Sequence, residues 1–245
     1  MKNTAGKRFV IGTVLALLLG GCGRPDVGWE YRSLLRSSYV SGSDYMEIAY
    51  PQAVGGAAAD SINRAIETYL HSVFGIEGTA DSMSLADAVD SLLRLRRSDS
   101  LYTSSTPYDL RANGRVSICG RVASVRLETY LLTGGAHGDF RVGILNFDLR
   151  DGRRIGPADL FADTVRLKAL NRAAFEKMLF DRGLSGDVLL VAPDRLPLPR
   201  NIGIDSSGVT MRYDPYRVAP YAFGDMEYRI PYDEAEPLLR RIARR

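Results

Sequence analysis

The spacing of hydrophobic and polar positions changes several times along the chain, and each spacing predicts a different type of element. Residues 45–50 alternate between the two classes and are followed by Pro51, which predicts an opening strand that ends at the proline. From residue 57 the apolar positions recur at helical spacing, and His71 falls on the polar side of this helix. The apolar positions of this helix and of a second helical stretch are Ile62, Ile66, Tyr69, Leu70 and Val73, then Leu85, Val89, Leu92 and Leu93.

Strands dominate the middle of the chain. The apolar run at 108–112 is interrupted by Asn113-Gly114, a dipeptide typical of a two-residue hairpin turn. Residues 116–132 are mostly extended in pattern, and 139–149 form another strand that Asp151-Gly152 turns back. This order predicts an antiparallel meander rather than βαβ winding.

Helical spacing returns near the C-terminus, followed by short strands. The expected elements are a helix at 164–182 capped by Asp163 or Thr164, a hairpin of 201–205 and 209–213, a strand at 227–230 and a basic helix at 233–243. The predicted fold class is therefore α+β, with one antiparallel sheet of hairpins and helices packed on one face.

The N-terminus has the pattern of a bacterial lipoprotein signal. Three cations precede the apolar run 9–19, and Gly20, Gly21 and Cys22 close it. The run is too short for a membrane span. We expect residues 1–21 to be a signal peptide and the Cys22 thiol to carry a diacylglycerol, which would anchor an extracytoplasmic protein to the cell membrane or outer membrane. A plain secretory signal and an uncleaved anchor are the alternatives.

Cleavage changes what charge and cysteine content imply. The formal net charge is +3, and all three cations of residues 1–21 leave with the signal, so the mature chain has no net charge and nucleic acid is not an expected partner. Cys119 is then the remaining thiol, in an apolar strand pattern typical of a buried, inert cysteine. We expect a tether at 22–38, an N-terminal subdomain at 39–132 and a C-terminal subdomain at 133–245 that continues the same globular unit.

Two stretches carry a resemblance to known bacterial domains. They are residues 130–138 with 146–149, 151–152 and 159–161, and residues 211–224 with 230–232. In order and spacing they resemble the paired domains of unknown function, of the DUF4163 plus DUF3298 type, in the lysozyme-sensing ectodomain of the anti-sigma-V factor. The same pair occurs as a non-catalytic N-terminal region of a peptidoglycan deacetylase and in many Bacteroidetes lipoproteins. The resemblance covers about residues 40–240.

The resemblance implies a binding or sensing role in the cell envelope, without catalysis. The sigma-binding segment, the membrane-spanning helix and the deacetylase domain of these relatives have no counterpart in the chain, so their activities are not expected. The ligand that the resemblance implies is a lysozyme-like protein or peptidoglycan. No cofactor or metal is expected.

A glycine-rich loop is the first candidate site. Gly134 and Gly135 permit close backbone approach, and His137 with Asp139 as its orienting carboxylate has the composition of a base or metal ligand. This reading makes the protein an envelope hydrolase or a metal-dependent enzyme. The alternative is that the glycines shape a tight connection that His137 locks. A metal site needs further ligands, and the other histidine lies on a helix.

Aromatic residues form the second candidate site. The tyrosines proposed for one surface are Tyr130, Tyr213, Tyr216, Tyr221 and Tyr232. Such side chains stack on sugar rings or anchor a protein partner. The alternative is that they pack a turn against a sheet.

Overall fold

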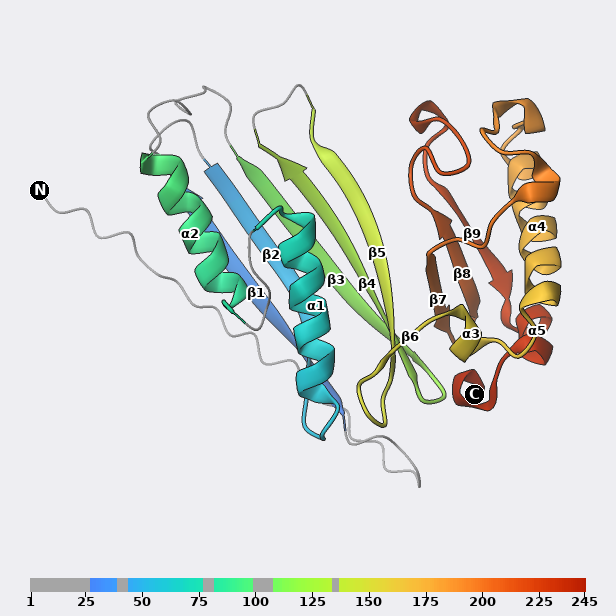
Figure 1. Cartoon of the computed structure of the whole chain (residues 1–245), viewed down its shortest axis with the longest axis horizontal. Coiled ribbons are helices and arrows are strands. Elements are labelled where there is room, and N and C mark those ends of the chain that lie inside the picture. The colour runs from blue at the N-terminus through green and yellow to red at the C-terminus, as the bar shows by residue number, and fades with distance from the viewer. Residues whose placement is uncertain (1–26, 39–43, 77–81, 99–107, 134–136) are drawn as a thin grey trace, which may run out of the picture. The chain divides into compact units, whose positions relative to one another are not determined.

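The computed structural model describes residues 27–38, 44–76, 82–98, 108–133 and 137–245. Contacts divide the chain into two compact units, Met1–Arg115 with Leu127–Arg141 and Val116–Arg126 with Val142–Arg245. We call them unit 1 and unit 2 (Figure 1). The division crosses three strands, so it differs from a single boundary at residue 132. The predicted signal peptide and Cys22 lie outside the described residues.

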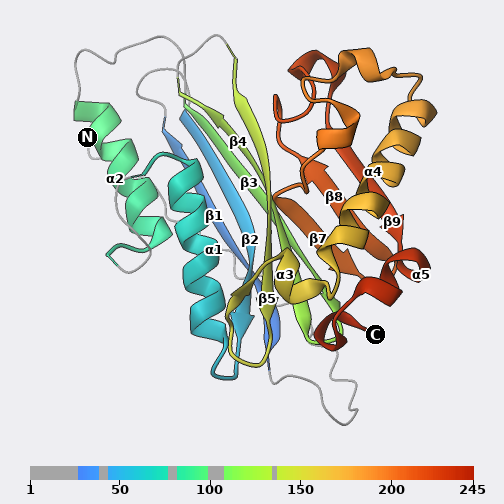
Figure 2. The same ribbon diagram turned by 45° about the vertical axis from the view of Figure 1, so that its right-hand side comes forward.

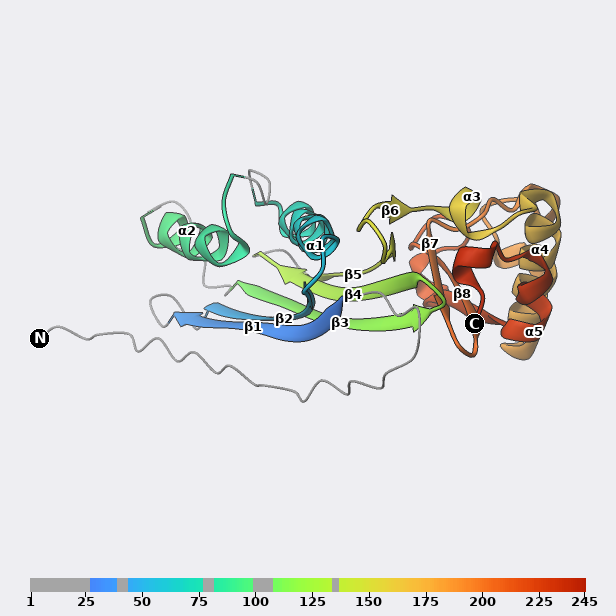
Figure 3. The ribbon, with the colours of Figure 1, turned by 90° about the horizontal axis from the view of Figure 1, so that it is seen from below.

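The longer sheet has six strands in the order β1-β2-β3-β4-β5-β6. Their bounds are Gly28–Ser38, Asp44–Val54, Asp109–Cys119, Val122–Leu132, Asp139–Asp148 and Arg154–Ile155. Helices α1 (Ala59–Val73) and α2 (Leu85–Ser98) follow β2 and lie on one face of the sheet (Figure 3). β1 pairs with β2 antiparallel, whereas β2 pairs with β3 parallel. The α+β class is confirmed, but the meander is wrong at β2–β3, because two helices supply the crossover that a parallel pair needs.

The tether predicted for residues 22–38 is a strand from Gly28 onward. Arg32 reaches Glu67 of α1 at 3.3 Å, and Arg36 reaches Asp90 of α2 at 2.7 Å. Arg32 and Arg36 lie on the side of β1 that faces the helices, where hydrophobic residues are expected, so the strand does not show an alternation of hydrophobic and polar residues. An arginine is tolerated there because its head group pairs with a carboxylate while its aliphatic part covers apolar surface.

Helix α1 buries a wider face than its apolar pattern predicts. Ile62, Ile66 and Leu70 are buried as expected, but His71 is only 1% exposed, so its placement on the polar side is wrong. Glu67 is also buried and accepts a hydrogen bond of 2.8 Å from the Tyr50 hydroxyl of β2. Packing against both the sheet and α2 covers these polar positions.

Two turn signals lie inside strands. Pro51 belongs to β2, where it lies opposite Tyr31 of β1 and beyond Ala49, at which the parallel pairing with β3 ends. Gly114 lies within β3. A Cβ at this position would lie only 2.5 Å from Pro51 Cδ and 2.9 Å from Leu127 Cδ2, which explains why the residue is glycine. The glycine therefore permits close packing, and the hairpin expected at Asn113-Gly114 is absent from β3.

Unit 2 contains a second sheet of three antiparallel strands. The strands are β7 (Asn201–Asp205), β8 (Gly208–Tyr213) and β9 (Met226–Pro231), in that order. Helix α4 (Thr164–Asp181) lies along this sheet (Figure 2), and the Asp163 carboxylate caps it by accepting from the backbone N–H of Val165 and Arg166. The short helix α3 (Pro157–Leu160) precedes it.

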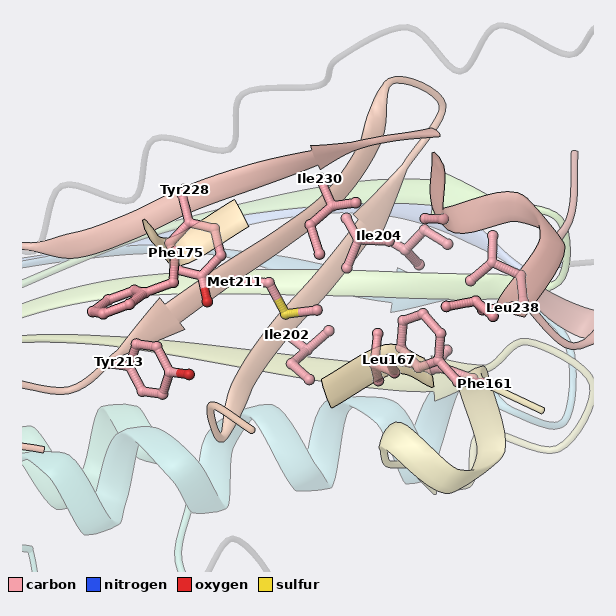
Figure 4. Packing of buried hydrophobic residues seen from close by; sticks show 14 of the residues in the cluster. Phe161, Leu167, Phe175, Ile202, Ile204, Met211, Tyr213, Tyr228, Ile230 and Leu238 are labelled. Carbon is pink, nitrogen blue, oxygen red and sulfur yellow. The ribbon is translucent and has the colours of Figure 1, made fainter. Parts of the chain in front are cut away.

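The core of unit 2 is apolar and packs on the three-stranded sheet, and α4 contributes Leu167 and Phe175 to it (Figure 4). Its buried members include Leu167, Phe175, Ile202, Ile204, Met211 and Ile230. On the other side of β7, the Ser124 hydroxyl accepts from the Ile204 N–H at 2.9 Å, and the Asn146 amide donates to the Ile202 carbonyl at 2.6 Å. These bonds fix β7 against the ends of β4 and β5 that belong to unit 2.

The basic helix predicted at 233–243 is replaced by short turns. They are α5 (Tyr232–Ala235) and the 3₁₀ turns η5 (Glu236–Leu238) and η6 (Arg241–Ala243). Pro237 has no N–H to continue a helix, and the terminal segment instead packs on the β3–β4 turn. There Cys119 Sγ lies 3.3 Å from the Ala243 carbonyl oxygen, and burial raises the pKa of this free thiol, as expected for an inert cysteine.

Candidate functional site

The loop between β8 and β9 carries exposed aromatic side chains. We call residues 214–225 the aromatic loop; it contains the 3₁₀ turn η4 (Tyr221–Phe223). Tyr216 is 68% exposed and Tyr221 is 59% exposed, and Phe223 is exposed beside them. Large aromatic groups at such exposure are typical of surfaces that bind a partner.

Buried aromatic side chains hold the strands at the base of this loop. Tyr213 is the last residue of β8 and Tyr228 lies near the start of β9, and both rings pack edge-on against Phe175 of α4 at 5.5 and 5.6 Å. The Asn171 amide donates to the Tyr213 hydroxyl and accepts from the Tyr228 hydroxyl. Burial raises the pKa of both phenols, so they remain protonated donors.

An ion-pair network holds the C-terminal end of the loop. Arg212 of β8 is only 1% exposed, and its two terminal nitrogens lie 2.8 and 2.9 Å from the Asp225 carboxylate. Arg182 donates to the backbone carbonyls of Asp225 and Glu227. The hydrogen bond from Arg212 is the main reason why the pKa of Asp225 lies below its ordinary value. Arg126 of β4 also pairs with Glu227, at 2.9 Å.

The remainder of the loop is fixed at two further points. The Asn201 amide donates to Asp214 at 2.8 Å, and the buried Val218 accepts from the Leu190 N–H at 2.8 Å. Asp214 and Asp225 are therefore both engaged. Among the described residues, Arg217 has no ion-pair partner, so a free cation lies beside the exposed tyrosines.

Tyr216 and Tyr221 form a stacked pair. Their ring centroids are 6.3 Å apart with an angle of 24° between the planes. Tyr216 has a positive φ of 62°, the sole non-glycine residue with this feature among the described residues. A tyrosine in this backbone region is strained, and such strain persists where the surrounding contacts enforce it. The loop thus presents two flat rings in a fixed orientation.

The structure separates the tyrosines that the sequence grouped. Tyr213 is buried as described above, and Tyr232 is buried with its hydroxyl accepting from the Arg245 N–H, so neither belongs to a surface. Tyr130 lies in unit 1, where a Cβ on Gly138 would come within 2.2 Å of its ring. Tyr216 and Tyr221 are the two candidates that the structure brings together.

In the glycine-rich loop, the hydrogen bonds of His137 and Asp139 go to other groups and not to each other. Gly134 and Gly135 lie outside the described residues. His137 is exposed, with Nδ1 3.2 Å from the Gly138 carbonyl oxygen, and Asp139 accepts from Arg141 at 2.7 Å. Within the described part of the chain, no group of three or more His, Cys, Asp or Glu side chains is arranged to hold a metal ion.

An apolar pocket of about 190 Å³ lies near the aromatic loop in unit 2. It opens between α4 and the segment 184–196, and its lining includes Phe175, Leu179, Phe180 and Leu196. The bond from Leu190 to Val218 connects this segment to the aromatic loop.

The sequence did not reveal the residues that hold the loop. The role of Arg212 and Arg182 depends on Asp225 of the aromatic loop and on Glu227 of β9, which are distant from both arginines in sequence. The one local signal is an arginine between the hydrophobic residues Met211 and Tyr213.

Comparison with known proteins gives a family match for one segment. Residues 158–233 match the model of the family "Protein of unknown function (DUF3298)". The aromatic loop lies inside the matched segment. No curated protein matches the chain.

Solved structures show the same fold. A DUF3298 family protein from Pseudomonas aeruginosa PAO1 is similar with a TM-score of 0.67 and 18% identity, covering 89% of this chain and 96% of that one. A DUF3298 family member from Bacteroides fragilis NCTC 9343 is similar with a TM-score of 0.56 and 19% identity, at the same coverage. Among the described residues, none of the helices has the length and apolar character needed to cross a membrane.

Proposed function

We propose that this protein is a lipid-anchored, extracytoplasmic binding or sensing domain of the cell envelope, and that the aromatic loop is its recognition surface. The observation that carries the proposal is the Tyr216–Tyr221 pair, which is exposed, stacked and held in place by the loop. Aromatic side chains contribute large contact areas at low entropic cost, which is why they are frequent among the residues that dominate binding energy.

The way the loop is held adds to this argument. A loop that is ordered only on binding loses conformational entropy at that moment, whereas a loop already fixed by Arg212, Asn201 and Val218 has lost it on folding. The strained backbone at Tyr216 is consistent with a position kept for function rather than for stability.

The sequence supports the proposed location and the proposed class of ligand. The lipobox-like end at Cys22 supports an envelope lipoprotein. The resemblance to the lysozyme-sensing ectodomain and to the N-terminal region of a peptidoglycan deacetylase favours a lysozyme-like muramidase as ligand, with peptidoglycan glycan second. Arg217, which follows Tyr216 in the chain, adds a positive charge to this surface, and a negative group on either ligand would complement it.

A binding titration tests this proposal. The full chain, purified in detergent micelles, is titrated with a muramidase and separately with solubilised peptidoglycan fragments. We expect saturable binding to one of them, weakened about 30-fold by Tyr216→Ala with Tyr221→Ala, since removing such anchors costs about 2 kcal/mol.

Phe140→Ala is the matched control. Phe140 is also an exposed aromatic residue, but it belongs to β5 in unit 1 and lies outside both the aromatic loop and the pocket lining. Its replacement should leave the affinity for the same ligand unchanged. Absence of binding to both ligands by the folded protein, or equal losses in the two variants, would overturn the proposal.

A further inference from the structure

Strand β1 separates two kinds of side chain onto the two faces of the sheet in unit 1. Arg32 and Arg36 point toward α1 and α2, where they pair with Glu67 and Asp90. Because side chains alternate along a strand, the odd-numbered residues of β1 lie on the face without helices. Those whose burial the structure describes are Trp29, Tyr31, Ser33 and Leu35. Figure 3 shows α1 and α2 on the opposite side of this sheet.

The face without helices exposes apolar and aromatic groups. Tyr31 is 46% exposed and Leu35 is 58% exposed, and Trp29 is half-buried beside them. The outer side of α1 is instead polar, with Asp60 and Thr68 exposed. Unit 1 therefore has one polar face and one face that carries amphipathic aromatic residues.

Charges on the helix-free face are nearly balanced. Arg111 of β3 pairs with Asp109 at 2.8 Å and lies over the Tyr45 ring, and the Tyr45 hydroxyl donates to Glu47. Arg115 is exposed further along β3. Among its described residues, this face has no cluster of cations of the kind that attracts a protein to anionic lipid, so we expect any affinity for a bilayer to come from its aromatic and apolar groups.

The distance from the expected lipid attachment to this face is short. Six residue steps separate Cys22 from Gly28, the first residue of β1. A chain spans at most about 3.6 Å per residue, so the start of β1 lies within roughly 20 Å of an acylated Cys22. Tryptophan and tyrosine favour the interface between lipid and water, and a short tether supplies a high local concentration for a weak contact.

We infer that the helix-free face of unit 1 lies against the lipid surface that holds Cys22, with Tyr31 and Leu35 at the level of the headgroups and the partly buried Trp29 beside them. This inference rests on the proposed lipid anchor. The occupant of the face is the bilayer itself, because the tether brings the bilayer within reach of β1. The contact is independent of anionic lipid, since the charges of the face are balanced.

Trp29 reports on this contact directly, because it is the one tryptophan of the chain. The full acylated chain is reconstituted into phosphatidylcholine vesicles with and without lipids brominated on their acyl chains, which quench nearby indoles. We expect a marked loss of Trp29 emission in brominated vesicles. The loss should be the same when part of the phosphatidylcholine is replaced by phosphatidylglycerol.

Two variants make the measurement specific. Trp29→Phe with Leu95→Trp moves the tryptophan to an exposed site of α2, on the other side of the sheet, and should show little quenching. Tyr31→Glu with Leu35→Glu places charges at two exposed positions of the face and should reduce the quenching of Trp29 to the level of the Leu95→Trp protein.

Co-sedimentation with the vesicles tests the lipid anchor separately from the placement of the helix-free face. Protein that sediments with vesicles but shows unquenched Trp29 overturns the placement of the face and leaves the anchor in place. Equal quenching of Trp29 and of the tryptophan at position 95 also overturns it. Protein that fails to sediment overturns the anchor on which the inference rests.

Discussion

Asp205 closes the hairpin between β7 and β8, and its carboxylate organises the turn. It accepts from the backbone N–H of Ser207 at 2.8 Å and of Gly208 at 3.1 Å, and from the Arg229 guanidinium at 2.7 Å. Burial alone would raise the pKa of Asp205, but the hydrogen bonds from Arg229 and Ser207 outweigh it and lower the pKa to about 2. The charged form is therefore favoured by folding.

This shift predicts how acid affects stability. A carboxylate with a lowered folded pKa stabilises the protein above the unfolded pKa near 4, and this contribution is lost as the pH falls toward 2. Asp205→Asn should lower the free energy of unfolding at pH 7 by about 1–2 kcal/mol, because its partner Arg229 is partly screened by solvent. Denaturant unfolding at pH 7, 4 and 2 checks this.

The comparison with Asp187→Asn controls for the removal of one negative charge, since Asp187 is exposed in a 3₁₀ turn of the same unit. The two variants should differ at pH 7 and converge at pH 2. An Asp205→Asn protein that keeps the full acid dependence of the parent would contradict the assignment.

The burial of several polar side chains could not be predicted from the sequence. His71 was expected on the polar side of its helix, and Tyr213 and Tyr232 were candidates for a surface with packing as the alternative; all three are buried. Asn171 and the Pro197 carbonyl satisfy the hydroxyl of Tyr213, and both come from segments distant in sequence. Tertiary partners of this kind leave no local pattern.

At the scale of elements, substitution of Gly114 tests whether this part of β3 is a packed strand or a hairpin turn. Gly114→Ala should destabilise the protein by about 1–3 kcal/mol, because the new methyl group would overlap Pro51 and Leu127 in a filled core. A two-residue hairpin turn at this position would instead expose the methyl group to solvent. The free energy of unfolding from a denaturant titration measures the difference.

Gly186→Ala is the matched control, because a Cβ at Gly186 would have no neighbour within 4 Å and its backbone is not left-handed. It should change the stability by less than about 0.5 kcal/mol. Equal effects of the two substitutions would refute the packing explanation for Gly114.

The elements that were predicted correctly have signals contained within a few residues. Helix α4 begins at the cap residue Asp163, and the β7–β8 hairpin turns at Ser206-Ser207-Gly208. The failures depend on distant partners: β1 pairs its arginines with the helices, and the terminal segment packs on the β3–β4 turn. For the candidate site, the sequence supplied Tyr216 and Tyr221 but not the network of Arg212 and Asp225 that holds them.

At the scale of the whole molecule, the fold is more widely shared than the side chains. Structures from Pseudomonas aeruginosa and Bacteroides fragilis cover 89% of the chain at 18% and 19% identity. At this level of identity, loops and surfaces change while the order of strands and helices is retained. The binding specificity of the aromatic loop and the placement of the β1 face must therefore be tested on this chain itself.

The attachment of the whole molecule depends on Cys22, and Cys119 provides an internal control. These are the two cysteines of the chain, and Cys119 is buried against the C-terminal segment. If Cys22 is the lipid attachment site, cells grown with labelled palmitate should label the protein, and Cys22→Ser should abolish the label. Cys119→Ser should retain it.

Processing gives a second readout of the same substitution. Cleavage before Cys22 would remove 21 of 245 residues, and if cleavage requires the lipid-bearing cysteine, the Cys22→Ser precursor should accumulate at full length. Mass spectrometry of the intact protein separates these forms. Equal processing of both variants without any label would identify a plain secretory signal, and the bilayer contact inferred for Tyr31 and Leu35 would then lose the tether that brings it within reach.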